Sequence, residues 1–121
     1  PFGCRFGPDG NLYVVSGNSN KVARFDLTGA YLGDFVPVGS GGLSLPVGLE
    51  FGPDGRLYVA AGGAGVQVFS PRGEHLGTIP TPLGAQAVAF AGPEKKTLYI
   101  VGGGAVYKVA MIARGLQRRA K

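Results

Sequence analysis

The strongest constraint on the fold of this chain is a nine-residue segment that occurs twice and then a third time in altered form. Residues 6–14 read Phe-Gly-Pro-Asp-Gly-Asn-Leu-Tyr-Val, and residues 51–59 differ only by Arg in place of Asn. Residues 90–100 read Phe-Ala-Gly-Pro-Glu-Lys-Lys-Thr-Leu-Tyr-Ile. The first two copies lie 45 residues apart, and Tyr58 lies 41 residues before Tyr99. Repeats of this length are typical of a four-stranded sheet unit and are too long for a leucine-rich repeat.

The glycine and proline content argues against helical repeats of similar length. The chain of 121 residues contains 23 Gly and 9 Pro, and both residue types disfavour helix interiors. Short strands joined by tight turns use both of them. In the repeated Gly-Pro-Asp-Gly segment, Pro presets a backbone angle, Asp can accept hydrogen bonds from the following backbone, and Gly allows a positive φ. We therefore expect Asp9 and Asp54 to be turn-forming residues.

Each repeat contains the same succession of short apolar runs separated by turn segments. The strands that we predict are residues 2–6, 12–15, 21–26, 31–35, 47–51, 57–61, 66–69, 75–79, 86–90, 97–101 and 105–109. Both alternating sets of positions in a strand are apolar, as Leu12 with Val14 and Tyr13 with Val15 illustrate. A sheet with one face in water would alternate apolar with polar residues. The pattern therefore predicts sheets that are covered on both faces by neighbouring sheets.

Together, period and pattern predict an all-β fold, a β-propeller of four-stranded antiparallel blades. We expect about three blades in residues 1–113, spanning about 1–45, 46–84 and 85–113, with the last blade lacking its outer strand. Known rings have roughly four to eight blades, so three blades leave two apolar faces to be covered. We expect dimerisation with a second copy, a protein partner or a missing N-terminal half of the protein to cover them.

The positive charge of the chain is concentrated at its end. Of the 12 Lys and Arg residues, four lie in the basic tail that we assign to residues 114–121, and the net charge is +5. The remainder carries eight positive and seven negative groups, so the composition does not favour a nucleic-acid partner. No apolar segment is long enough to predict a transmembrane span. The chain begins at Pro1 without Met, which suggests a processed or truncated product and leaves the localisation unknown.

Residues 45–59, with Pro46, Gly48 and the Phe-Gly-Pro-Asp-Gly-Arg-Leu-Tyr-Val segment, resemble the NHL repeat, and residues 1–10 repeat that pattern. The second half is similar to the C-terminal part of the gluconolactonase, senescence-marker-protein and luciferin-regenerating family. This similarity covers residues 65–69, 73–80, 89–93 and 97–100. Both resemblances imply a six-bladed propeller.

The lactonase resemblance also implies one divalent metal above the central channel, held by a Glu, an Asn and an Asp. Transferred by position, the Asn falls at Phe2 and the Asp at Gly52, while the Glu lies outside this chain. A further Asn that is common in bacterial relatives falls at Ala87. These side chains offer no oxygen donor to a hard cation. The sequence therefore does not predict that the metal site accompanies the fold.

Other polar residues are candidates for contact with a ligand or a partner. We expect Arg5, Glu50 and Gln86 to lie on or beside the innermost strands, where channel water or a small ligand could meet them. Asn18 and Asn20 are candidates for loop contacts. The isolated histidine and cysteine have no partners in the sequence, so we expect His75 to be a surface imidazole and Cys4 a buried, inert thiol.

Three functions are compatible with these observations. The main prediction is a non-catalytic NHL-type propeller segment that acts as a scaffold or protein-interaction module without a cofactor, because no nucleophile–base pair is apparent. The alternative is the C-terminal part of a gluconolactonase-like, metal-dependent hydrolase, which would require a divalent metal such as calcium or zinc. A second alternative is a propeller that binds sugars or peptides.

Overall fold

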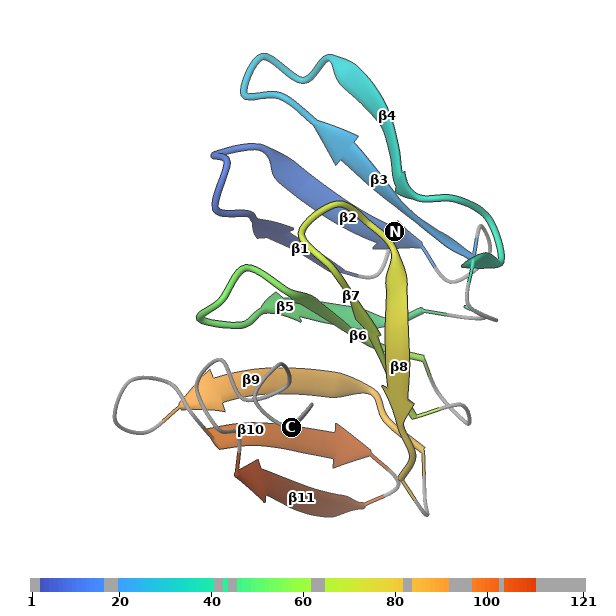
Figure 1. Cartoon of the computed structure of the whole chain (residues 1–121), viewed down its shortest axis with the longest axis vertical. Helices are drawn as coiled ribbons and strands as arrows, with labels where there is room; N and C mark the ends of the chain where they lie inside the picture. Colours follow the sequence, from blue (N-terminus) through green and yellow to red (C-terminus); the bar gives the residue numbers. More distant parts are fainter. Residues whose placement is uncertain are drawn as a thin grey trace.

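The structure, a computed structural model, describes residues 3–16, 20–40, 43, 46–61, 65–81, 84–91, 97–102 and 104–110. Within these ranges it is built from three antiparallel sheets stacked on one another (Figure 1). Blade one contains β1 (Gly3–Phe6), β2 (Leu12–Ser16), β3 (Lys21–Phe25) and β4 (Tyr31–Val36). Blade two contains β5 (Gly48–Phe51), β6 (Leu57–Ala60), β7 (Val66–Phe69) and β8 (His75–Ile79). Blade three contains β9 (Ala87–Ala91), β10 (Thr97–Gly102) and β11 (Ala105–Ala110).

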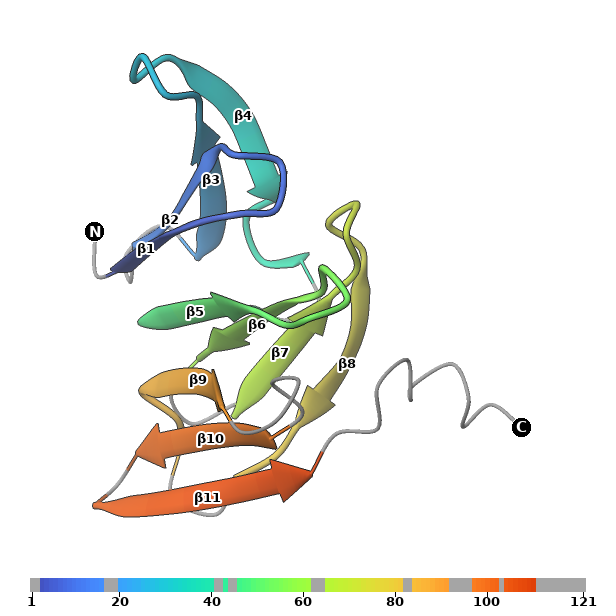
Figure 2. The same cartoon turned by 90° about the vertical axis from the view of Figure 1, so that its left-hand side faces the viewer.

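The predicted fold class is confirmed. Every predicted strand is present, with bounds that differ from the predicted ones by one residue at most. In each blade the strands pair in chain order, so that the first strand lies at one edge of the sheet. Figure 2 shows the same succession of blades from the side. The fourth strand predicted to be absent from blade three would follow Ala110, outside the described residues.

The Gly-Pro-Asp-Gly turns form as the sequence predicts. The backbone N–H of Gly10 donates to the carbonyl of Gly7 at 3.0 Å, and Gly55 donates to Gly52 at the same distance. Gly10 and Gly55 have φ angles of 84° and 89°, which a residue with a side chain rarely adopts. The carboxylates of Asp9 and Asp54 accept hydrogen bonds from the backbone two residues later. These turns join the first strand of each of the two blades to the second.

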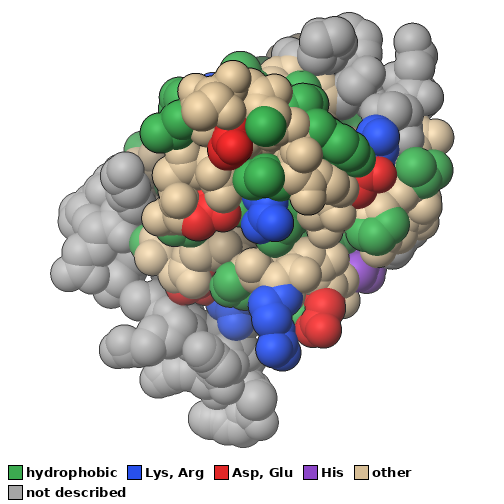
Figure 3. Space-filling view, turned by 90° about the horizontal axis from the view of Figure 1, so that it is seen from above, with side chains coloured by type: hydrophobic (Ala, Val, Ile, Leu, Met, Phe, Trp, Pro, Cys, Tyr) green, Lys and Arg blue, Asp and Glu red, His purple; other side chains and the backbone are tan. Residues whose placement is uncertain are grey.

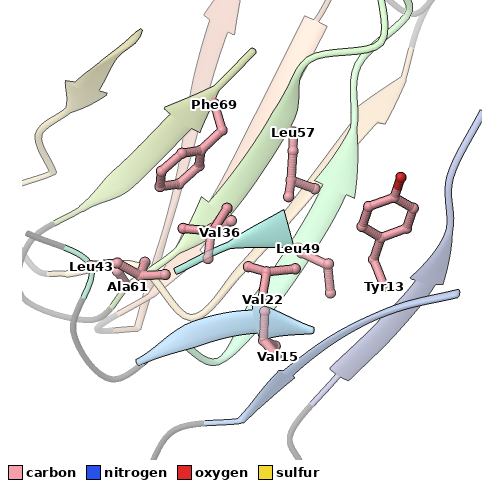
Figure 4. Packing of buried hydrophobic residues seen from close by; sticks show 10 residues of the cluster. Tyr13, Val15, Val22, Val36, Leu43, Leu49, Leu57, Ala61 and Phe69 are labelled. Carbon is pink, nitrogen blue, oxygen red and sulfur yellow. The ribbon is translucent and has the colours of Figure 1, made fainter. Parts of the chain in front are cut away.

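Two apolar clusters hold the three blades together. The first fills the space between blades one and two, and ten of its buried residues are drawn in Figure 4. It contains Tyr13, Val15, Val22, Val36, Leu43, Leu49, Leu57, Val59, Ala61 and Phe69. The second lies between blades two and three and contains Tyr58, Ala60, Val66, Val68, Ala85, Val88, Leu98 and Ile100. Blade two is therefore covered on both faces, which explains why all the residues of β6 and β7 are buried.

No helix long and apolar enough to cross a membrane occurs in the part of the chain that the structure describes.

Candidate functional site

The first strands of the three blades, β1, β5 and β9, lie next to one another along one side of the molecule. The pairing register makes Gly3, Gly48 and Ala87 equivalent, because they lie opposite Val15, Ala60 and Val101 on the second strands. These small residues line a cavity of about 190 Å³. Its other lining residues are Cys4, Arg5, Val47, Leu49, Gln86 and Val88. This cavity is the candidate functional site of the chain.

Gly48 is required for the close approach of the second and third blades at this cavity. A Cβ atom at Gly48 would lie 2.9 Å from the carbonyl oxygen of Gln86 and 3.4 Å from the Cα of Ala87. Backbone atoms at those distances cannot move away without displacing β9. The glycine therefore determines how tightly β5 and β9 can converge on the cavity.

An ion pair between blades one and two borders this cavity. The Nε of Arg5 donates to Oε1 of Glu50 at 2.9 Å, and Nη1 of Arg5 donates to the Cys4 carbonyl at 3.2 Å. Arg5 and Glu50 occupy equivalent positions of their blades, opposite Tyr13 and Tyr58. The Arg5 side chain is 53% exposed and the Glu50 side chain 26% exposed. Glu50 thus holds the Arg5 guanidinium on one side, and the rest of the guanidinium is open to solvent.

The structure brings three of the predicted polar candidates to the cavity or its edge. Arg5 and Gln86 both line the cavity, and Glu50 contacts Arg5. Gln86 does not occupy the position equivalent to Arg5 and Glu50, which in blade three is held by Ala89, opposite Tyr99. Gln86 precedes β9, and its backbone N–H donates to the carbonyl of Val101 at 2.7 Å. Its side chain is exposed beside the cavity.

Of the two loop candidates, one lies outside the described residues and the other does not line the cavity. Asn18 lies outside the described residues. Asn20 has a left-handed backbone conformation with φ 53°, which Asn tolerates better than most residues. Its carbonyl accepts a hydrogen bond from the Gly39 N–H at 2.9 Å, so Asn20 joins the segment before β3 to the turn after β4.

The residues at the expected metal positions do not fit a metal. Phe2 lies outside the described residues, Ala87 lines the cavity without an oxygen donor in its side chain, and Gly52 follows the far end of β5. A Cβ at Gly52 would lie 2.9 Å from Cε1 of Tyr58 and 3.1 Å from Cζ of Phe90, so this position is occupied by the packing between blades two and three. Within the described ranges, no group of three His, Cys, Asp or Glu residues could hold a metal ion.

The prediction that Cys4 is buried was wrong, because its thiol is exposed. Cys4 is equivalent to Leu49 and Val88, which lie opposite Val59 and Ile100 and are each 4% exposed. Leu49 and Val88 are covered by the blade before their own. Among the described residues no blade lies before blade one, so the Cys4 side chain is exposed. The expectation that His75 is at the surface is confirmed.

Two polar networks outside the cavity were not predicted. In blade one, Oδ2 of Asp9 accepts hydrogen bonds from the Tyr13 hydroxyl at 2.8 Å and the Asn11 amide at 3.1 Å, with Arg24 at 3.6 Å. Burial tends to raise the pKa of Asp9, but these hydrogen bonds and the Arg24 charge outweigh it and lower the pKa below its usual value. Burial, together with the hydrogen bond to Asp9, raises the pKa of Tyr13.

The second network lies in blade two and centres on Gln67, which is 4% exposed. Its Oε1 accepts a hydrogen bond from the Thr78 hydroxyl at 2.9 Å and lies 2.6 Å from Nε2 of His75. The His75 ring also contacts Phe69, with 5.5 Å between ring centroids. These contacts give the single histidine a structural role between β7 and β8.

Comparison with known proteins gives a consistent result. Residues 3–103 match the family described as the SMP-30/Gluconolactonase/LRE-like region. No curated protein matches the chain. Among solved structures, a gluconolactonase from Xanthomonas campestris is 32% identical with a TM-score of 0.77, and the match covers 93% of this chain and 38% of that one.

Two further structures show the same similarity. A proposed gluconolactonase is 31% identical with a TM-score of 0.78, and the match covers 91% of this chain and 38% of that one. A luciferin-regenerating enzyme is 22% identical with a TM-score of 0.68, which shows the fold alone, over 84% of this chain and 37% of that one. The chain thus spans less than two fifths of the length of these proteins.

Proposed function

Because this chain belongs to the SMP-30/gluconolactonase/LRE-like family, we propose that it forms part of the substrate-channel wall of a gluconolactonase-like hydrolase. The observation that carries the proposal is its identity of 31–32% to the structures of a gluconolactonase and a proposed gluconolactonase over more than nine tenths of its length. This similarity favours the hydrolase over the scaffold that the sequence alone led us to prefer. The family match over residues 3–103 includes every residue that lines the cavity between β1, β5 and β9.

Arg5 is the residue of this wall best suited to bind a lactone. A guanidinium carries five N–H donors, and the contacts of Arg5 with Glu50 and the Cys4 carbonyl use two of them. The remaining donors can bind hydroxyl or carbonyl oxygens of a sugar lactone. Glu50 restricts the guanidinium to one orientation, which reduces the entropy lost when a ligand binds. In this proposal, Arg5 binds and orients the substrate, and Glu50 positions Arg5.

The cavity has the size of a partial binding site. Its volume of about 190 Å³ is below the roughly 300–1,000 Å³ that is typical of complete small-molecule pockets. Gln86, which lies just before the first strand of blade three, lines the same cavity as Arg5 of blade one. Arg5 and Gln86 would therefore contact a ligand from the first and third blades, with the remainder of the site formed by other blades.

The proposal assigns no metal to the described residues. Gly52 and Ala87 cannot donate oxygen ligands through their side chains, and the described residues do not contain a suitable acidic or histidine cluster. A metal of such an enzyme would be held by other residues. We therefore derive no catalytic step through a metal from this chain.

The second candidate remains the non-catalytic propeller segment. It is favoured by Gly52 and Ala87, which occupy positions that the family resemblance assigns to metal ligands. In that case the cavity beside Arg5 would be solvated or would bind a sugar without hydrolysing it.

Gluconolactone hydrolysis distinguishes the two functions. The assay follows acid release by this chain and by the natural gene product that contains it, with calcium, zinc or magnesium added. We expect hydrolysis above the spontaneous rate in the natural product, and a rate reduced at least about tenfold in its Arg5→Ala variant, as expected when a charged hydrogen bond to the substrate is lost. Lys21→Ala, which removes an ion pair of blade one with Asp34 at 3.2 Å, is the matched control. A spontaneous rate with all three metals would support the non-catalytic segment instead.

A further inference from the structure

Arg5 is the only charged residue among the described residues that line the cavity between β1, β5 and β9. Gln86 adds an amide, and the other lining residues are glycine, alanine, valine, leucine and cysteine. Glu50 contacts Arg5 but does not belong to the lining, so no described carboxylate lines the cavity. A ligand in this cavity therefore meets a guanidinium and an amide on an otherwise uncharged wall.

The solvent exposure of Arg5 does not depend on a blade before blade one. Arg5 lies opposite Tyr13, as Glu50 lies opposite Tyr58, and its side chain reaches the following blade, where it contacts Glu50. The side chain is 53% exposed although blade two is in place beside it. Its exposure is thus a property of the cavity wall that the innermost strands form together.

The contacts of Arg5 leave part of its guanidinium available. Nε donates to Oε1 of Glu50 at 2.9 Å, and Nη1 donates to the Cys4 carbonyl at 3.2 Å. Within the described residues, Nη2 has no hydrogen-bond acceptor. The unused donors are therefore one on Nη1 and both on Nη2. Donors on two neighbouring nitrogens form the fork with which arginine binds a carboxylate through two parallel hydrogen bonds.

Glu50 and the Cys4 carbonyl also hold this fork in place. Because the guanidinium is already held at Nε and Nη1, it loses little further freedom when a ligand binds. A carboxylate at the fork would accept charge-assisted hydrogen bonds, which are roughly twice as strong as those between neutral groups. The fork is therefore better suited to a carboxylate than to the carbonyl or hydroxyl groups of a neutral lactone.

The hydrolysis of a sugar lactone creates such a carboxylate. The oxygen of a water molecule adds to the carbonyl carbon, the bond from this carbon to the ring oxygen breaks, and the ring oxygen takes up a proton from the water. The resulting carboxylic acid releases a proton to solvent, because a carboxyl group is ionised at neutral pH. Substrate and product therefore differ by one negative charge.

We propose that Arg5 binds the carboxylate of the product, a sugar acid, and that this product inhibits the enzyme by occupying the cavity. The identity of the ligand rests on the proposed hydrolase function, whereas the recognition of a carboxylate rests on the unused donors of Arg5. The Gln86 amide, which lines the same cavity, can donate to and accept from hydroxyl groups of the acid. The product then competes with a new lactone molecule for the same guanidinium.

The other cations of the described part of blade one do not line the cavity. Lys21 pairs with Asp34 at 3.2 Å, and Arg24 lies 3.6 Å from Asp9. Figure 3 looks onto the blade-one end of the molecule, where acidic and basic side chains lie next to one another. Lys21→Ala therefore removes a cation of the same blade without altering the cavity, and it is the matched control.

The first test measures the binding of gluconate and of sorbitol, an uncharged polyol with the same number of carbons, to the natural gene product that contains this chain. We expect calorimetry to show that gluconate binds at least about tenfold more tightly, because hydrogen bonds to a charged group are the stronger ones. Arg5→Ala should remove this difference, whereas Lys21→Ala should retain it. Equal affinities of the parent for the two compounds would overturn the proposal, as would a preference for gluconate that survives Arg5→Ala.

Arg5→Lys separates the fork from the charge. Lysine keeps the positive charge but lacks the planar pair of donors. Gluconate should bind this variant more weakly than the parent and more tightly than Arg5→Ala, while the affinity for sorbitol stays low in all three. If Arg5 had only a structural role, its substitutions would lower the unfolding midpoint and leave the ratio of the two affinities unchanged. That result would contradict the proposal.

Steady-state kinetics separates this inference from the proposed function. Gluconate should inhibit gluconolactone hydrolysis competitively, with an inhibition constant below KM, and sorbitol at the same concentration should not inhibit. Hydrolysis without inhibition by gluconate would overturn the inference and leave the hydrolase in place. Gluconate binding that requires Arg5, without any hydrolysis, would overturn the hydrolase and support the carboxylate site.

A lactone of a sugar diacid would bring a carboxylate into the cavity as part of the substrate. A lactone of glucaric acid is therefore assayed beside gluconolactone. We expect similar KM values for the two lactones, because the carboxylate that the fork binds is the one that hydrolysis creates. A much lower KM for the diacid lactone, lost in Arg5→Ala, would assign the fork to the substrate and overturn its assignment to the product.

Discussion

The Nε of Arg5 lies 2.9 Å from Oε1 of Glu50, so a single ion pair joins the first strands of two successive blades at the edge of the cavity. Both side chains have solvent access, at 53% and 26%. Ion pairs of this kind contribute about 0–1 kcal/mol to stability. The pair therefore contributes little to holding the blades together, and under the proposed function it positions the Arg5 guanidinium for a ligand.

Replacement of Glu50 by Gln tests this assignment. The variant keeps a hydrogen-bond acceptor but removes the charge that orients Arg5. We expect the free energy of unfolding to change by less than about 1 kcal/mol, while KM for gluconolactone rises several-fold in the natural gene product. Urea unfolding and steady-state kinetics measure the two effects. Asp34→Asn, which removes the Lys21 partner on β4, should leave KM unchanged. An equal rise in both variants would contradict a specific role for Glu50.

Gly52→Ala is expected to destabilise the fold. The added methyl would lie 2.9 Å from the Tyr58 ring and 3.1 Å from the Phe90 ring, in the aromatic contact between blades two and three. Overpacking of this kind typically costs about 1–3 kcal/mol. Gly77→Ala is the control, because nothing lies within 4 Å of the Cβ position at Gly77. Thermal unfolding of both variants measures the difference, and equal midpoints would show that the rings yield to the methyl group.

Gly52→Asp extends this test to the metal question. If Gly52 were a vacant ligand position, the carboxylate should create calcium or zinc binding. The structure instead leads us to expect a loss of stability at least as large as that of Gly52→Ala, with no metal binding by isothermal calorimetry. Stoichiometric binding by the variant would contradict the packing role assigned to Gly52.

The fold could be predicted because each repeat carries its own turn and strand chemistry. The Gly-Pro-Asp-Gly segment fixes where β1 and β2 join, and the apolar residues at both alternating positions of β2 require cover on both faces. Neither inference depends on knowing which blades are neighbours. The strand bounds were therefore accurate to one residue, whereas the environment of Cys4, which depends on a neighbouring blade, was wrong.

The ion pair of Arg5 with Glu50 was also not predicted, although the sequence contained a signal for it. The two residues are 45 positions apart and occupy the same place in successive repeats with opposite charges. Equivalent positions of adjacent blades are close in space, so opposite charges there could have indicated a contact. The partners of Gln67 had no comparable signal, since the β7–β8 pairing shifts register between Val68 and Phe69.

Asp9→Asn is predicted to reduce stability more at neutral than at acidic pH. Asp9 accepts hydrogen bonds from Asn11 and Tyr13, which together with the Arg24 charge outweigh burial and lower its pKa in the folded state. A lowered pKa contributes stability above the unfolded value of 3.8 that is lost as the pH falls through the folded value. We expect a cost of about 1 kcal/mol at pH 7, given the partial exposure of the carboxylate.

Urea unfolding of this variant and the parent at pH 7 and near pH 3 measures the effect of Asp9→Asn. Asp54→Asn serves as the control in blade two, where the carboxylate accepts a hydrogen bond from the Arg56 backbone at 3.1 Å and contacts the Arg56 side chain. It should cost less, because Asp54 has no hydrogen bond from Tyr58 corresponding to the one that Tyr13 donates to Asp9. An Asp9→Asn effect that is independent of pH would contradict the role of the ionised carboxylate.

Tyr58 is expected to make the fold sensitive to alkali. Its side chain is 2% exposed, and burial, with a contribution from the nearby Asp54 charge, raises its pKa from 10.0 to about 12. Below pH 10 the phenol is neutral in both the folded and the unfolded chain, so its contribution to stability is fully present. As the pH rises towards 12, the unfolded chain ionises first, and stability falls by up to about 1.4 kcal/mol for each pH unit.

Tyr58→Phe separates this effect from the titration of the other groups. Phe preserves the ring that packs against Phe90 at 4.9 Å between centroids, so we expect a change in the free energy of unfolding of less than about 1 kcal/mol at pH 7. The other groups titrate in both proteins, so the difference between their unfolding free energies isolates Tyr58. That difference should shift in favour of the variant between pH 10 and 12, as measured by urea unfolding at closely spaced pH values. A constant difference over this interval would mean that the Tyr58 hydroxyl reaches solvent when it ionises.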